Sequence, residues 1–285
     1  MKNIVLLAGL TALMMSSCEV KEKVSSSNGE PFGMNIACAD FGSVFPGEYN
    51  KDYTYPTDSD LVYWEKKGLK LVRMPFKWER LQYKLDGGLN KHDLEKMKEF
   101  VVAAQKRGIK VLLDLHNYCR RFENGDHRII GTYGITNQNY AGFWKKIASE
   151  FKDYDNIYGY GLMNEPHDLP DSISWFKMAQ LAIDSIRMVD TKNTIVVGGN
   201  SWSSAKRWLT ESDTLKFLKD PAENLMFEAH CYFDKDGSGT YKYSYEEEEG
   251  TPEKGRQLVA PFVEWLSQNN LKGIVGGKHS INYKF

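Results

Sequence analysis

The segment Asn164-Glu165-Pro166 places an amide, a carboxylate and a proline directly after an apolar run, residues 157–163. Proline disfavours helical geometry in the residue before it, so we expect Glu165 to be extended at the end of a strand. In barrels of parallel strands, side chains at the C-terminal strand ends line the active site, where a carboxyl group can exchange protons with a substrate. The alternative is that Glu165 caps the next helix, but Asp171 lies nearer to the predicted start of that helix.

Polar side chains accompany the ends of three further apolar runs. Arg73 lies near the end of one run, His116 and Asn117 follow another, and His230 and Tyr232 follow a third. The C-terminal ends of parallel strands meet at one rim, so these groups are predicted to converge around Glu165. Each has a structural alternative: Arg73 could pair with a core carboxylate, His116 could be a core histidine and Tyr232 could be a packing residue. Their shared position at successive strand ends favours a site.

Short apolar runs alternate with longer helical patterns along the chain. This order predicts a parallel sheet, and the continuous apolar strands fit one that is covered on both faces. Seven strands can be counted, whereas a closed barrel of this type has eight. The predicted strands are 33–37, 69–74, 109–115, 157–163, 194–199, 225–229 and 273–276, and the clearest helices are 91–107, 140–151, 172–189 and 258–268.

Composition limits the possible partners. The chain has 285 residues with 37 basic and 38 acidic side chains, so its charge balance gives no reason to bind nucleic acid or an anionic membrane surface. Seven Trp and sixteen Tyr suggest a flat, weakly polar ligand. The pattern is typical of one sizeable domain, which we expect to be a monomer.

The N-terminus has the features of an export signal. Lys2, an apolar run over residues 4–15 and Ser16-Ser17-Cys18 predict a signal segment 1–18 that resembles a bacterial lipoprotein signal, with Cys18 as the lipidated residue. The alternative is an ordinary cleaved secretion signal. Residues 19–30 are charged and serine-rich and predict a flexible tether. The protein is therefore expected to be exported and lipid-anchored to the bacterial cell envelope, at the outer membrane or cell surface, with the lipid as its only membrane contact.

The remaining cysteines, Cys38, Cys119 and Cys231, are odd in number and lack metal-ligand spacing, so no zinc site is predicted. We expect them to be buried or half-buried thiols. The segment that follows the strand at 225–229 is predicted to be a loop that shapes the substrate cleft.

Five motifs carry a family resemblance. Gly33-Met34-Asn35-Ile36-Ala37, Arg73-Met74-Pro75, Asp114-Leu115-His116-Asn117-Tyr118, Asn164-Glu165-Pro166-His167 and His230-Cys231-Tyr232 resemble, in order and spacing, those of glycoside hydrolase family 5. The similarity is greatest to the endo-β-1,4-glucanase, or cellulase, branch and covers residues 33–276.

The resemblance implies an α/β fold, the (β/α)8 TIM barrel, in residues 31–276, and an enzyme that hydrolyses β-1,4-linked glucan polysaccharide or oligosaccharide with retention of configuration. Such hydrolysis uses two carboxyl groups and implies no cofactor or metal. Glu165 would be the acid/base, a role that requires a raised pKa. The other implied roles are Asn164 bonding the sugar 2-hydroxyl, Arg73 and Tyr232 positioning the nucleophile, His116, Asn117 and His230 lining subsites, and Trp202 and Trp78 stacking on sugars, although Trp202 could equally be a packing residue.

The chain departs from the family pattern where the nucleophile is expected. The last predicted strand should lead into Gly-Glu, but the sequence reads Gly276-Gly277. No segment of the sequence matches the eighth strand or the last helix of the barrel. Without a nucleophile the two-step reaction has no covalent intermediate, so we expect an inactive chain. Deleting one G from the codons of this segment permits Gly-Glu, and residues 277–285 are accordingly interpreted as an out-of-frame tail. The alternative is a catalytically dead lipoprotein that binds glycans at the cell surface.

Overall fold

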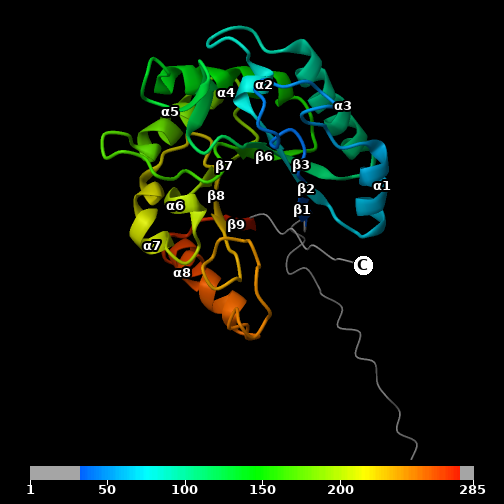
Figure 1. Cartoon of the computed structure of the whole chain (residues 1–285). Coiled ribbons are helices and arrows are strands. Elements are labelled where there is room, and N and C mark those ends of the chain that lie inside the picture. Colours follow the sequence, from blue (N-terminus) through cyan, green and yellow to red (C-terminus); the bar gives the residue numbers. More distant parts are fainter. Residues whose placement is uncertain (1–32, 277–285) are drawn as a thin grey trace, which may run out of the picture. The chain divides into compact units, whose positions relative to one another are not determined.

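Seven parallel strands form one sheet in the computed structural model, which describes residues 33–276 (Figure 1). Their order across the sheet is β1-β2-β3-β6-β7-β8-β9, and every neighbouring pair is parallel. The sheet is nearly closed into a barrel with helices on its outside, which confirms the predicted fold class. Cys18, the predicted signal and tether of residues 1–30, Gly277 and the predicted tail 277–285 lie outside the described residues.

All seven predicted runs are strands, with ends that differ by one or two residues. The largest shift is in β2, which begins two residues later than predicted and continues through Pro75 to Phe76, paired along its whole length with β3. The strands are β1 (Gly33–Asn35), β2 (Leu71–Phe76), β3 (Lys110–Leu115), β6 (Ile157–Gly161), β7 (Thr194–Gly198), β8 (Leu225–His230) and β9 (Gly273–Gly276).

The four predicted helices are present. They are α3 (Lys91–Lys106), α4 (Asn137–Phe151), α5 (Trp175–Arg187) and α8 (Lys254–Asn269). The start of α5 was predicted three residues too early, because Ser174 rather than Asp171 caps it by accepting a hydrogen bond from the backbone of Lys177. Within residues 33–276, no helix is long and apolar enough to cross a membrane.

Several shorter elements were not predicted. They are α1 (Asp58–Lys66), α2 (Trp78–Leu81), the hairpin β4 (Arg120–Glu123) with β5 (Asp126–Ile129), α6 (Asn200–Ser203), α7 (Trp208–Glu211) and the 3-10 helix η2 (Asp213–Phe217). All of these lie in segments that follow the C-terminal end of a barrel strand, where loops of such barrels build the binding surface.

Helix α4 holds the backbone that leads into Glu165. The Tyr140 hydroxyl and the Trp144 indole both donate hydrogen bonds to the carbonyl of Leu162, at 2.7 and 3.0 Å. Both side chains are fully buried, so these bonds form in an apolar surrounding where an unsatisfied carbonyl is unfavourable. The buried face of α4 therefore fixes the chain directly after β6.

Substitution of Trp144 by alanine is expected to lower the free energy of unfolding by about 3–5 kcal/mol, since it leaves a cavity and removes one bond to Leu162. Urea denaturation measures this change. The matched control is Tyr63→Ala on α1, where the side chain is 59% exposed, and the expected change is within about 0.5 kcal/mol. Equal losses in the two variants would contradict the role assigned to Trp144.

Candidate active site

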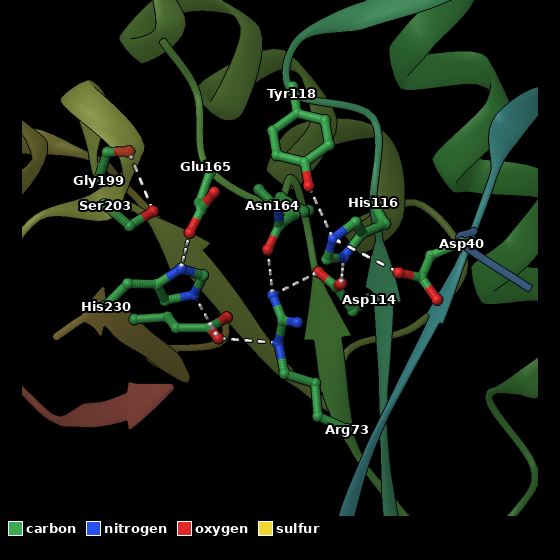
Figure 2. Close-up of polar contacts among 12 residues, drawn as sticks. Asp40, Arg73, Asp114, His116, Tyr118, Asn164, Glu165, Gly199, Ser203 and His230 are labelled. Carbon is green, nitrogen blue, oxygen red and sulfur yellow. Dashed lines mark hydrogen bonds and ion pairs between the residues drawn. The ribbon is translucent and has the colours of Figure 1, made fainter. Parts of the chain in front are cut away.

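Glu165 lies at the C-terminal rim of the barrel, shortly after β6, with its carboxylate directed at residues from the end of β8 (Figure 2). Its Oε1 atom is 2.6 Å from His230 Nδ1 and accepts a hydrogen bond from the Tyr232 hydroxyl at 3.1 Å. The Glu165 side chain is only 12% exposed. The structure thus brings together three residues that the strand-end pattern had placed at one rim.

The backbone of Glu165 is not extended, contrary to the prediction from Pro166. Its φ angle is 45°, in the left-handed region that residues other than glycine seldom adopt. The bonds from His230 and Tyr232 hold the side chain in place, and this outweighs the backbone preference of a residue before proline. Strain of this kind persists only where the surroundings determine the conformation, as they do at functional sites.

Arg73, on β2, joins the ends of three other strands. Its Nη2 atom donates to Asn164 Oδ1 at 2.8 Å and lies 2.9 Å from Asp114 Oδ1, while its Nε atom lies 2.8 Å from Glu228 Oε1 (Figure 2). All four side chains are buried. The planar guanidinium has donors at fixed angles, so it sets the relative positions of its partners. The amide of Asn164 is oriented in this way next to Glu165.

Sequence reasoning missed Glu228. It lies on β8 two residues before His230, so the two side chains share one face of the strand. Its Oε1 atom contacts both Arg73 Nε and His230 Nε2, the latter at 3.1 Å. A carboxylate in the middle of an otherwise apolar strand was the available signal, because a buried charge requires a partner.

His116, which directly follows β3, is held by Asp114 on that strand and by Tyr118 after it. Its Nδ1 atom is 2.7 Å from Asp114 Oδ2, and its Nε2 atom is 3.1 Å from the Tyr118 hydroxyl. The imidazole is 2% exposed, so these contacts fix its ring plane. His116 therefore lies at the same rim as Glu165, as predicted.

Asn117 and Trp78, both predicted to contact sugar, make contacts within the fold. The Asn117 amide donates to both carboxylate oxygens of Glu79 and accepts from the backbone of Trp78, so its hydrogen-bonding capacity is used within the fold. Trp78 itself is fully buried and stacks on Phe143 with ring centres 5.3 Å apart. The prediction that Trp78 stacks on a sugar is wrong, because the short helix α2 turns its ring into the core.

Trp202 remains accessible. Its ring is 39% exposed and stacks on His167 with centres 4.6 Å apart and an angle of 12° between the planes. Its backbone N–H donates to the carbonyl of Pro166 at 3.1 Å. The indole is therefore tied to the segment that carries Glu165. His167, Tyr118 and Asn117 are among the residues that line a cavity of about 500 Å³.

The charges at the rim control the protonation of Glu165. Burial alone would lower the pKa of His230, but its bonds to Glu165 and Glu228 outweigh this and raise it to about 9. Burial would likewise raise the pKa of Glu228, which Arg73 and His230 instead lower to about 2. Burial also acts to raise the pKa of Glu165, yet the bond and charge of His230 lower it. The raised pKa expected for an acid/base is therefore not found with these neighbours.

The chain is similar over most of its length to known proteins. The family model described as Cellulase (glycosyl hydrolase family 5) matches residues 25–280. Endo-beta-1,4-glucanase B of Aspergillus niger is 32% identical over 255 residues, which are 89% of this chain and 72% of that protein.

Solved structures agree with this similarity. Endoglucanase Cel5A of Pseudomonas stutzeri, in complex with cellobiose, superimposes with a TM-score of 0.78 at 38% identity, covering 86% of this chain and 72% of that one. XacCel5A, in complex with cellopentaose, superimposes with a TM-score of 0.79 at 37% identity, covering 88% of this chain and 79% of that one.

Replacement of Glu228 by glutamine is expected to lower the pKa of His230 from about 9, because one of the two carboxylates that stabilise the imidazolium is removed. An NMR titration of the His230 ring measures the midpoint. The matched control is Glu99→Gln on α3, a partly exposed carboxylate that pairs with Lys96. A midpoint unchanged by Glu228→Gln would show that Glu228 does not hold the charge of His230.

The raised pKa of His230 makes the free energy of unfolding depend on pH. The pKa of His230 in the folded chain, about 9, is above the ordinary value of 6.5, so the folded state binds this proton more tightly. The stabilisation is expected to be fully present below about pH 6.5 and to disappear as the pH rises through about 9. Urea denaturation at pH 6 and pH 9.5 should show a smaller pH dependence in Glu228→Gln than in the unmodified chain.

Proposed function

Because this chain belongs to glycosyl hydrolase family 5, the cellulase family of glycosidases, we propose that its rim is the site of a retaining endo-β-1,4-glucanase. The observation that carries the proposal is the position of Glu165, held at the barrel rim by His230 and Tyr232. A carboxyl group held in this way can meet the oxygen of a glycosidic bond that lies across the strand ends.

In retaining hydrolysis, Glu165 acts twice. It first donates a proton to the departing glycosidic oxygen while a second carboxylate attacks the sugar, and it then takes a proton from the water that releases the sugar. Asn164, oriented by Arg73, supports this proposal because its amide lies next to Glu165 in the chain and is held by a bond at 2.8 Å. Trp202 offers an exposed aromatic surface for the apolar face of a glucosyl ring.

We propose further that this sequence lacks the nucleophile. The family pattern expects a glutamate directly after β9, and the residue there is Gly277. Among residues 33–276, the carboxylates beside Arg73 are poor substitutes. Asp114 and Glu228 are both buried and paired with its guanidinium, so neither can approach a sugar carbon without breaking an ion pair. Loss of a nucleophile reduces turnover by a factor on the order of a millionfold in a well-studied protease.

The ligand we propose is a β-1,4-linked glucan chain. This assignment is supported by the relatives, whose structures were solved with cellobiose and with cellopentaose. Gly277 also favours a second candidate function, in which the chain binds such glucans at the cell surface without cleaving them. Both candidate functions have the same ligand. They differ in whether the functional protein has a carboxylate at position 277.

We expect the 285-residue chain to bind cellopentaose without releasing shorter sugars, since the acid/base is present and the nucleophile is not. Calorimetry measures the binding, and chromatography of the incubated sugar measures cleavage. The variant Glu165→Gln should bind similarly, and Glu99→Gln serves as a surface control. Cleavage by the unmodified chain would contradict the missing nucleophile, and absence of binding would contradict the proposed ligand.

Azide offers a second test of the proposal that the nucleophilic carboxylate is missing. With 4-nitrophenyl β-cellobioside, azide can attack the anomeric carbon from the face opposite the aryl group. The bond to the aryl oxygen then breaks with its electron pair going to that oxygen, and 4-nitrophenolate and α-cellobiosyl azide are formed. We expect azide-dependent release of 4-nitrophenol that exceeds the rate without protein. The variant Gly277→Glu should lose this response, because its carboxylate would repel the anion.

For localisation, we propose that the chain is exported and anchored through a lipid on Cys18. Expression in a bacterial host with labelled palmitate is expected to label the unmodified chain and bring it into the membrane fraction. Cys18→Ala should remove both the label and the membrane association, whereas Cys231→Ala should keep them. Label retained in Cys18→Ala would rule out this anchor.

A further inference from the structure

The loop between β8 and α8, residues 231–253, exposes several large aromatic side chains. The loop is drawn in orange beside α8 in Figure 1. Tyr243 and Tyr245 are 65% and 60% exposed, and Phe233 and Tyr241 are 42% and 39% exposed. A cavity of about 520 Å³ lies between these four rings. We refer to Phe233, Tyr241, Tyr243 and Tyr245 as the aromatic platform.

Two buried carboxylates hold the backbone of this loop. Asp234 is 3% exposed and accepts hydrogen bonds from the backbone of Gly239 and Thr240, each at 3.0 Å. Glu248 is 8% exposed and accepts from the backbone of Lys235 and Tyr243. Both carboxylates therefore serve the shape of the loop. The rings are exposed on a fixed frame, which reduces the conformational entropy lost on binding.

The aromatic platform directly follows a residue of the candidate active site in the chain. Tyr232, whose hydroxyl bonds to Glu165, directly precedes Phe233 of the platform. The Phe233 backbone N–H donates to the Tyr241 hydroxyl at 3.1 Å, which joins two members of the platform. The backbone of Gly239 packs so closely on the Tyr232 ring that a Cβ atom there would lie 2.6 Å from it. One continuous segment thus contacts Glu165 and carries the platform.

The chemistry of the platform fits a neutral, amphipathic ligand. A glucosyl ring has an apolar face of C–H groups and a rim of hydroxyls, and tyrosine combines an apolar ring with a hydroxyl that can hydrogen-bond. Glu248 and Lys254, the charged residues that line the cavity, carry opposite charges and do not favour an ion of either sign. Binding cavities are mostly apolar with a few polar groups, and this cavity has that character.

We propose that the aromatic platform binds glucosyl residues of a β-glucan chain beyond those held at Glu165. The inference rests on the proposed function and extends it, because a chain lying across the rim would continue over Tyr232 onto the platform. Glucans long enough to reach both places then bind more tightly than short ones. A second copy of this chain is the other occupant that the test must separate from glucan.

The experiment compares cellobiose and cellohexaose by calorimetry with the full chain and with Tyr243→Ala/Tyr245→Ala. We expect the double variant to bind cellohexaose about tenfold more weakly, since two stacking rings are lost, and to bind cellobiose unchanged. The matched control is Tyr63→Ala/Phe217→Ala, whose side chains are 59% and 58% exposed on α1 and η2. It should leave both affinities unchanged.

A conservative variant separates stacking from hydroxyl contacts and from loss of folding. Tyr243→Phe/Tyr245→Phe keeps both rings and should keep most of the cellohexaose affinity. Urea denaturation should give the same midpoint for all variants, because the substituted side chains are exposed.

The outcomes are distinct. Cellohexaose affinity unchanged by Tyr243→Ala/Tyr245→Ala overturns the platform but leaves the proposed function standing, since the cleft would still bind. No binding of either sugar by the unmodified chain overturns both. A dimer seen by light scattering in the unmodified chain and lost in the double variant, together with unchanged cellohexaose affinity, would assign the platform to a second copy.

Discussion

The buried guanidinium of Arg73 is the constraint on which the site depends. A buried cation is strongly unfavourable unless it is paired and hydrogen-bonded, and Arg73 meets this condition through Asp114, Glu228 and Asn164. These partners come from β3, from β8 and from the segment after β6. Satisfying one charge therefore fixes the ends of four strand segments relative to one another. Breaking one pair would leave an uncompensated charge in the barrel.

The sequence predicted the sheet well because its signal is local. Each strand is a short apolar run. A run that is covered on both faces can be recognised from its own residues, without knowing which strands it pairs with. Short elements such as α2 and the hairpin of β4 and β5 were missed for the opposite reason. A helix of one turn has too few residues to show a period, so its position depends on tertiary contacts such as the hydrogen bond that the Trp78 backbone N–H donates to the Asn117 side chain.

The site was predicted in part. Family motifs and strand ends identified Arg73, His116, Glu165, His230 and Tyr232, which the structure brings to one rim. Motifs do not say which way a side chain points, and this is where the interpretation of Trp78 failed. The backbone of Glu165 was also mispredicted, since a local preference set by proline is weaker here than two hydrogen bonds to the side chain. Roles that depend on orientation therefore required the three-dimensional structure.

The charges at the rim bear on the proposed acid/base and on the proposed loss of the nucleophile. His230, whose pKa is raised to about 9, lowers the pKa of Glu165, which disfavours the protonated form of that carboxyl group. A second carboxylate close by would act in the opposite direction, since two like charges cannot both ionise easily and one pKa must rise. If a glutamate at position 277 is the nucleophile, as we propose, it would also help Glu165 to keep its proton. Under the proposal, glycine at that position removes both contributions, whereas the proposed glucan contacts of Asn164, Trp202 and the aromatic platform depend on neither.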